Sequence, residues 1–272
     1  MKIAFCSTEV VPYVKVGGLA DVSGALPKEI FSFGKDIKIF LPKYKKIDSE
    51  KFGLKPMNIS YEIKLAKKKY KGSLWSAFFP RTQMQVVFID CPELYDRNEV
   101  YGEKGGDYPD SLERFAFFNL SVLESFKLLN WKADIIHCND WPTGLLPVYL
   151  KNVYNKKDGY NNIGTLMTIH NVGYQGMFPE KEFKKLDLPK ELYKKGVLEF
   201  FGRLNLLQGG LVFADKINAV SVTYSKEIET KEYGCGMEDL LVSKKEDVTG
   251  ILNGVDYHDW SPEVDELIPQ KF

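Results

Sequence analysis

Short apolar runs that do not alternate with polar residues constrain the fold of this chain most. The clearest lie at residues 3–6, 134–141, 165–171 and 216–221, and the last three turn polar at their carboxyl ends. Strands of a parallel sheet are buried on both faces and therefore have continuous apolar sequences, whereas a half-exposed strand alternates. We therefore predict an α/β fold with a doubly wound, mainly parallel Rossmann-like sheet and helices on both faces.

The first part of the chain predicts a βαβ unit followed by a hairpin. Residues 19–31 carry apolar side chains at helical spacing, and residues 36–42 form a short strand that Pro42 ends. Turn residues separate three further strand-like runs, at residues 57–65, 74–79 and 84–89. These runs predict a β-hairpin excursion near residues 57–90, whose last strand returns to the main sheet.

A long loop and an aromatic helix come next. Residues 91–110 are rich in glycine, proline, tyrosine and aspartate, and a loop of this length is usually functional or mobile. Asp110 and Glu113 are spaced for a capping box at the start of a helix. Apolar residues from Phe115 to Leu129 recur at spacings of three and four, so we expect this stripe to be core.

Composition excludes several classes of protein. The 272 residues include 37 lysines and arginines and 37 aspartates and glutamates, so the net formal charge is zero and no nucleic-acid partner is indicated. No stretch approaches the roughly 18 apolar residues of a membrane span, and the N-terminus lacks the pattern of a signal peptide. The four cysteines contain no C-x-x-C pair, so we expect buried, reduced thiols in a soluble intracellular protein.

A lysine and two glycines stand where the first strand turns into the first helix, in the stretch 15–18. The free N–H groups and the positive dipole end of a helix N-terminus attract anions, and glycines let a ligand approach the backbone. Lys15 can add a point charge on a phosphate. A glycine pair here can equally be a tight turn alone. The stretch is neither a G-x-G-x-x-G fingerprint nor a Walker A loop.

Polar residues follow the predicted strands at one edge of the sheet. The 15–18 stretch, residues 137–140, His170 and Asn171 are far apart in sequence, but ligands of open α/β sheets bind beyond the carboxyl ends of the strands. We expect these residues to lie close together and to suit a sugar phosphate or nucleotide sugar. The alternatives are that His137 is a core histidine held by a backbone carbonyl and that Asp140 caps the next helix.

Several motifs resemble those of bacterial glycogen synthases and plant starch synthases. Residues 15–22 match the K-x-G-G-L-A-D-V signature of that family. Further matches follow in order, at residues 91–97, 137–141, 168–176, 234–238, 252–256 and 260–262. The resemblance implies α-1,4-glucosyl transfer, with retention, from ADP-glucose (UDP-glucose in some members) to the non-reducing end of an α-1,4-glucan or maltooligosaccharide. It implies no cofactor, no metal and a cytoplasmic location, or a plastid in a plant or alga.

The resemblance also assigns roles to residues of this chain. Asp140 and His170 are the implied catalytic residues beside the transferred glucose, and Lys15, Gly17 and Gly18 are the implied donor-phosphate site. Weaker assignments to the acceptor or the cleft are Asp21, Tyr95, His137, Asn139, Asn171 and Gln175. No covalent intermediate is obligatory, because the leaving phosphate can itself accept the acceptor's proton, and stabilisation of that phosphate then dominates.

The chain departs from the family in two ways. Asn139 and Pro142 stand where many members have histidine, and we expect the family's second, nucleotide-binding domain to begin just past residue 272 and so to be absent from this chain. We therefore expect residues 1–260 to be the N-terminal, acceptor-side domain and residues 261–272 to begin the interdomain linker, in a fragment that is inactive alone. The alternatives are a non-catalytic glucan-binding module and a related glycosyltransferase with another acceptor.

Overall fold

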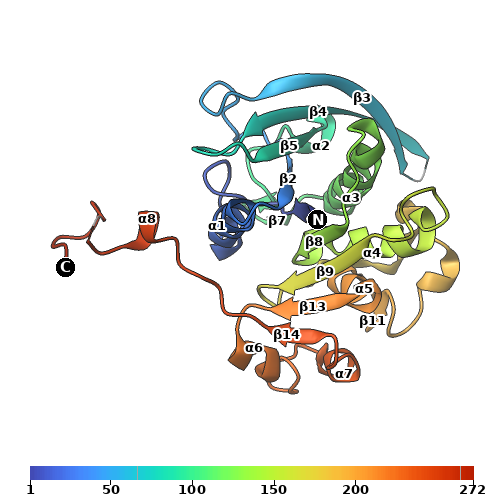
Figure 1. Ribbon diagram of the computed structural model, residues 1–272. Coiled ribbons are helices and arrows are strands. Elements are labelled where there is room, and N and C mark those ends of the chain that lie inside the picture. Colours follow the sequence, from blue (N-terminus) through green and yellow to red (C-terminus); the bar gives the residue numbers. More distant parts are fainter. Residues whose placement is uncertain (66, 264) are drawn as a thin grey trace.

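The computed structural model describes residues 1–65, 67–263 and 265–272, so Val264 of the expected linker lies outside the described residues. Within them, a nine-stranded sheet organises the fold (Figure 1). In sheet order the strands are β14 (Val248–Gly250), β13 (Lys216–Ala219), β9 (Gly164–Ile169), β8 (Ile135–Asn139), β1 (Lys2–Cys6), β2 (Asp36–Pro42), β5 (Gln85–Asp90), β4 (Lys68–Phe78) and β3 (Lys55–Leu65).

The sheet is parallel from β14 to β5, and the last two strands pair antiparallel. This arrangement confirms the predicted doubly wound sheet with a hairpin excursion. The edge strand β3 has a register shift between Pro56 and Ile59. Two smaller sheets are formed by β10 (Met177–Pro179), β12 (Arg203–Asn205) and β11 (Glu199–Phe200), and by β6 (Gly102–Glu103) and β7 (Gly106–Asp107).

The helices lie between the strands along the chain. They are α1 (Gly18–Ser32), α2 (Pro92–Tyr95), α3 (Ser111–Leu128), α4 (Leu145–Tyr149), α5 (Leu206–Phe213), α6 (Val222–Glu227), α7 (Glu238–Ser243) and α8 (Tyr257–Trp260). Shorter 3-10 or π turns are η1 (Trp141–Thr143), η2 (Leu150–Tyr154), η3 (Glu180–Leu186) and η4 (Lys190–Leu192). None of the helices in the described residues is long and apolar enough to cross a membrane.

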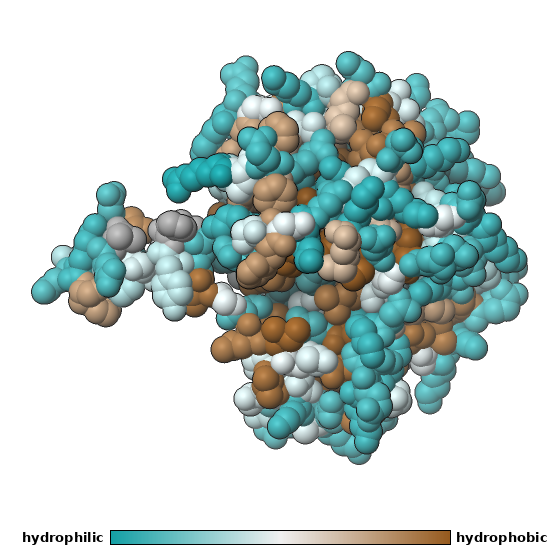
Figure 2. Space-filling view, viewed as in Figure 1, coloured by the Kyte–Doolittle hydropathy of each residue, from teal (hydrophilic) through white to brown (hydrophobic). Residues whose placement is uncertain are grey.

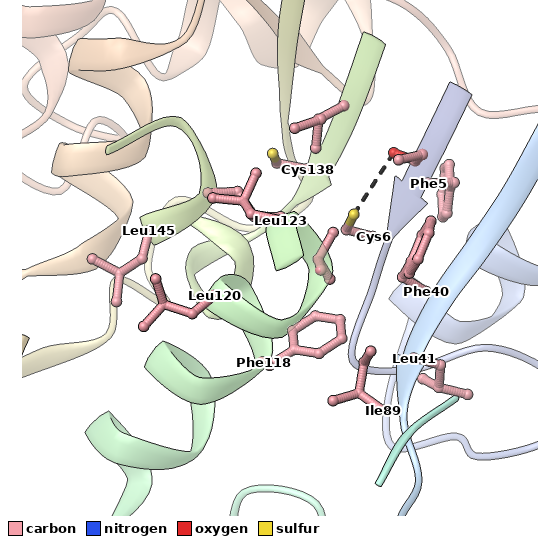
Figure 3. Close-up of a cluster of buried hydrophobic side chains, with 14 of the residues drawn as sticks. Phe5, Cys6, Phe40, Leu41, Ile89, Phe118, Leu120, Leu123, Cys138 and Leu145 are labelled. Atoms are coloured by element: carbon pink, nitrogen blue, oxygen red, sulfur yellow. Dashed lines mark hydrogen bonds between the residues drawn. The ribbon is translucent and has the colours of Figure 1, made fainter. Parts of the chain in front are cut away.

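Consecutive buried residues show that helices cover both faces of the central strands. Residues 86–89 of β5 and residues 136–139 of β8 are all buried, and neighbouring residues of a strand point to opposite faces. Figure 3 shows Phe118 and Leu123 of α3 near the thiols of Cys6 and Cys138, in the core beside β1 and β8. The aromatic stripe of α3 is therefore core, as predicted.

Three local predictions are wrong. Asp110 and Glu113 form no capping box, because the Asp110 carboxylate accepts from Arg97 and Glu113 pairs with Lys185 of η3. The second hairpin strand begins at Lys68, six residues earlier than expected, and β14 was not predicted. The cysteines are all free, and three are buried as expected, but Cys235 is exposed.

The order of the strands places a crevice beside β1. The chain passes from β1 to β2 on one side and later to β8 on the other, so β1 and β8 flank the point where the winding reverses. In open α/β sheets ligands bind at this point, beyond the carboxyl ends of the strands. The C-terminal segment that contains α8 leaves this part of the molecule and extends away from it (Figure 1).

Candidate functional site

A cavity of about 850 Å³ lies at the carboxyl ends of β1, β8 and β9. This volume is typical of small-molecule sites. It is lined by Glu9, Val16, Gly17, Gly18, Leu19, Val22, Tyr101, Asp107, Asp140, Trp141, Pro142, His170, Asn171, Gly173, Tyr174, Gln175, Gly176, Met177, Phe178, Val220 and Asn253. Figure 2 shows a mostly hydrophilic face on which hydrophobic residues gather near the middle.

The backbone at the end of β8 presents Asp140 to the cavity. Asp140 has a φ of 55°, a conformation that costs free energy for a residue other than glycine. Its N–H donates to the Thr168 carbonyl of β9 at 3.0 Å, and its carbonyl accepts from both the N–H and the hydroxyl of Thr143. These bonds hold the strained turn, which is the kind of geometry that recurs at functional sites.

The Asp140 carboxylate binds the neighbouring strand end. Its Oδ1 accepts from the N–H of His170 at 2.8 Å, so residues 30 positions apart meet as predicted. The side chain makes no capping bond to η1, and the alternative of a helix cap is therefore wrong. Burial raises the pKa of Asp140 to about 7, although N–H groups of His170 and Asn171 oppose that shift. A carboxyl poised near neutrality in a cavity is a candidate functional group.

His170 is a neutral imidazole held by Asn139. The Asn139 amide nitrogen donates to the Cys6 carbonyl at 3.0 Å. This bond turns Oδ1 of Asn139 toward Nε2 of His170, and these two atoms are 3.0 Å apart. Since Oδ1 only accepts, Nε2 carries the proton and Nδ1 remains an acceptor. Burial lowers the pKa of His170 to about 4, so the ring is uncharged at neutral pH.

His137 lies in the core. It is 6% exposed, does not line the cavity, and packs edge-on against Phe5 with a centroid distance of 4.7 Å. Its Nε2 bonds the Thr168 hydroxyl at 2.7 Å. His137 is therefore a core histidine, as the alternative proposed, but its partner is a hydroxyl and not a backbone carbonyl. Burial, with His170 as a smaller cause, lowers the pKa of His137 to about 3.

The 15–18 stretch, here called the glycine loop, already holds an internal anion. The Glu9 carboxylate Oε2 accepts from the N–H of Val16 at 2.6 Å and of Gly17 at 2.7 Å. Helix α1 begins at Gly18, and the N–H groups of Gly18 and Leu19 bond no other described residue. The Glu9 carboxylate therefore occupies part of the anion site predicted here, and Gly18 and Leu19, whose N–H groups bond no other described residue, line the cavity.

Lys15 and Asp21 form an ion pair outside the cavity wall. Their charged atoms are 2.7 Å apart, and the side chains are 48% and 33% exposed. Such a pair contributes little stability, so Lys15 can turn toward a ligand at small cost. Asp21 lines a neighbouring hollow beside α1.

Tyr95 does not lie in the cleft, contrary to the expectation. It is fully buried, its hydroxyl donates to the Arg114 carbonyl at 2.9 Å, and its ring packs against Tyr44 and Phe117. Asn171 and Gln175 do line the cavity. The Gln175 amide donates to the carbonyls of residues 172 and 235, which ties this part of the wall to the segment around residue 235.

Glu9 and an aromatic wall are site features that the sequence analysis missed. Trp141 stands edge-on to Phe115 at 4.8 Å, with the rings of Tyr101 and Phe178 each 6.2 Å away. Glu9 follows β1 at its carboxyl end, and this position was the signal that could have identified it. Aromatic faces beside polar groups suit sugar rings, which have both apolar and hydroxylated faces.

Gly176 fits closely beneath Trp141. It has a φ of 62°, and a Cβ built there would lie 2.3 Å from a ring carbon of Trp141. We expect Gly176→Ala to lower the free energy of unfolding by about 1–3 kcal/mol, measured by urea denaturation. Gly254→Ala is the control, because its Cβ would meet no atom within 4 Å. Equal stability of the two variants would contradict this packing.

Among the described residues, no group of three or more histidine, cysteine, aspartate or glutamate side chains lies where it could hold a metal ion.

Comparisons with known proteins agree with the geometry. A family model described as "Starch synthase catalytic domain" matches residues 2–243. The chain is 40% identical to a glycogen synthase of Thermodesulfovibrio yellowstonii, over 100% of this chain and 57% of that protein. It is 41% identical to a glycogen synthase of Thermosipho africanus, over 98% of this chain and 55% of that protein. The chain spans about half the length of the curated relatives it matches.

A solved structure is similar over the whole chain. The catalytic domain of starch synthase IV from Arabidopsis thaliana, bound to ADP and acarbose, superposes with a TM-score of 0.88 at 29% identity. The superposition covers 100% of this chain and 55% of that one.

Proposed function

Because this chain belongs to the starch synthase catalytic domain family, we propose that it is the N-terminal, acceptor-side half of a retaining α-1,4-glucan glucosyltransferase. The whole enzyme adds glucose from ADP-glucose to the non-reducing end of a glucan, in the cytoplasm and without a metal ion. Residues 1–260 are the domain proper, residues 261–272 begin a linker, and the half alone has negligible turnover.

One observation carries this proposal. A single cavity combines two free backbone donors at the start of α1 with the Asp140 carboxyl and the neutral imidazole of His170. The donors suit the donor's phosphates, and Lys15 can reach the same anion from the rim. Asp140 and His170 suit hydroxyls of the transferred and acceptor sugars. Asn171, Gln175 and Asn139 then shape the acceptor side, with Asn139 acting through His170.

The chemistry follows from the order of these groups. Electrostatic stabilisation of the departing phosphate by the donors and Lys15 weakens the bond between phosphate and sugar. The departing phosphate accepts the proton of the acceptor hydroxyl on the same face, so configuration is retained. In this proposal the Asp140 carboxylate, which lines the cavity, stabilises the positive charge that develops on the sugar ring.

Lys15→Ala in the full-length protein tests the phosphate site. We expect kcat/KM for ADP-glucose to fall about 10–100-fold, since a charge-assisted contact to phosphate is lost, while thermal stability stays unchanged. Incorporation of labelled glucose into glycogen measures the effect. Lys68→Ala, which removes an exposed lysine on β4, is the matched control.

Two outcomes would redirect the proposal. No incorporation from ADP-glucose by the full-length protein, together with maltooligosaccharide binding, would favour a non-catalytic glucan-binding module. Incorporation into another acceptor alone would favour a related glycosyltransferase. A wild-type kcat/KM in Lys15→Ala would contradict the assignment of Lys15 to the phosphate site.

A further inference from the structure

We propose that Glu9 is a positioning residue for the nucleotide-sugar donor. Its carboxylate fixes the glycine loop so that the N–H groups of Gly18 and Leu19 face the cavity and remain free for the donor's phosphates. This inference rests on the proposed function and adds a residue whose carboxylate contacts the glycine loop.

Three hydrogen bonds hold the carboxylate of Glu9, which is 4% exposed. Oε2 accepts from the N–H groups of Val16 and Gly17, and Oε1 accepts from the Tyr101 hydroxyl at 2.7 Å. A buried charge is costly unless such bonds compensate it, and bonds to an ionised acceptor are stronger than neutral ones. The carboxylate therefore ties the glycine loop to the 91–110 segment.

The backbone of Glu9 is fixed as well. The Ser7 hydroxyl donates to the Glu9 carbonyl at 2.7 Å, and the hydroxyl of Ser23 in α1 donates to Ser7 at 3.0 Å. The Tyr101 hydroxyl also bonds the Thr8 hydroxyl at 3.0 Å. Glu9 is thus held by Ser7, which is itself bonded to α1, and by Tyr101 of the 91–110 segment before any ligand arrives.

This arrangement separates two possible effects of Glu9 on the donor. A fixed negative charge beside a phosphate site repels the phosphate, so a carboxylate that merely occupied the site would weaken donor binding. A carboxylate that orders the loop in advance strengthens donor binding, because the ligand no longer bears the entropy cost of ordering it. The three short bonds and the two remaining free N–H groups favour the second effect.

Steady-state kinetics of the full-length protein distinguish these effects. We expect Glu9→Ala to raise the KM for ADP-glucose at least about tenfold, because bonds to a charged group are lost. The KM for glucan should stay near the wild-type value. Glu124→Gln is the matched control: Glu124 also accepts from a tyrosine hydroxyl, that of Tyr154, but it lines a different hollow.

Glu9→Gln allows a second measurement, the pH dependence of the rate, which a purely structural role of Glu9 would leave unchanged. Burial is the main cause of the raised pKa of Asp140, N–H groups of His170 and Asn171 act against it, and the charge of Glu9 is a smaller cause that also raises it. Removing the charge should move the acid limb of the pH–rate profile to lower pH. Tyr44 and Tyr101 are the titratable groups that interact with Glu9, and His170 and Tyr224 are those beside Asp140; Asp107 lines the same cavity.

The outcomes are distinct. An unchanged or lower KM for ADP-glucose in Glu9→Ala, or equal increases in both KM values, would overturn the inference. If Glu9→Ala does not fold, Glu9→Gln and Tyr101→Phe decide it by the same KM comparison. Absence of glucose incorporation by the wild type would contradict the proposed function. Calorimetric titration with ADP would then test Glu9 by itself. Equal affinity of the wild type and Glu9→Gln for ADP would overturn the role of Glu9.

Discussion

Asp140→Asn is expected to lower kcat of the full-length enzyme about 10²–10³-fold, the largest effect on activity among the variants considered. The substitution keeps an oxygen that can accept the N–H of His170, so the loop geometry is retained. It removes the negative charge that is available to a developing positive charge on the sugar. Glucose incorporation at saturating substrates measures the loss, and a wild-type kcat would exclude Asp140 from the chemistry.

The same variant should be more stable than the wild type at alkaline pH. The folded pKa of Asp140 is about 7 and its unfolded value is 3.8, so the folded state binds more protons between these values. Stability from this group is therefore present at acid pH and is lost as pH rises from about 4 to about 7. At pH 8, Asp140→Asn should raise the free energy of unfolding by roughly 2–4 kcal/mol.

Urea denaturation of both proteins at pH 4 and pH 8 checks this sign. The difference between variant and wild type should be larger at pH 8 than at pH 4. Asp215→Asn is the opposite control, because hydrogen bonds from Lys151 and Thr165 lower the pKa of Asp215 despite its desolvation. That variant should be less stable than the wild type at pH 8.

His170→Ala should lower kcat/KM about 10²-fold, the second largest effect. The variant removes the imidazole, with its acceptor Nδ1, from the lining of the cavity, and loss of the proposed bond to a sugar hydroxyl would weaken binding of the transition state. The pKa of about 4 means that the wild-type ring is neutral throughout the working range, so His170 itself should add no titration near pH 6–7.

Asn139→Ala is the companion variant to His170→Ala. It leaves the imidazole in place but removes the Oδ1 that holds Nε2, so we expect a smaller loss in the same direction. Unchanged kinetics in His170→Ala combined with a loss in Asn139→Ala would contradict the assignment, since Asn139 would then act on another group. Unfolding curves of both variants separate lost stability from lost function.

The central sheet could be predicted because its strands are apolar on both faces. Residues 86–89 and 135–138 have no alternation, and burial on both sides is the physical reason. The short strand β14 has no such run and takes its place by pairing with β13, which is a tertiary effect. The early start of β4 was missed because its first lysines point to solvent while Tyr70 between them is buried.

The site could be predicted as far as backbone topology determines it. Asp140 and His170 follow adjacent parallel strands, so their meeting follows from the sheet alone. The position of Tyr95 depends instead on the direction of one side chain, which turns into the core. Glu9 was missed because a single carboxylate after a strand has no distinctive pattern until the loop N–H groups that it binds are located.

The edge strand β3 has a consequence for association between molecules. An unpaired strand edge can pair with another chain, and proteins avoid this with proline, bulges and charged residues. β3 carries Pro56, the register shift before Ile59, and the exposed charges of Lys55, Glu62 and Lys64. The opposite edge, β14, is only three residues long. Both ends of this sheet therefore resist strand-to-strand aggregation.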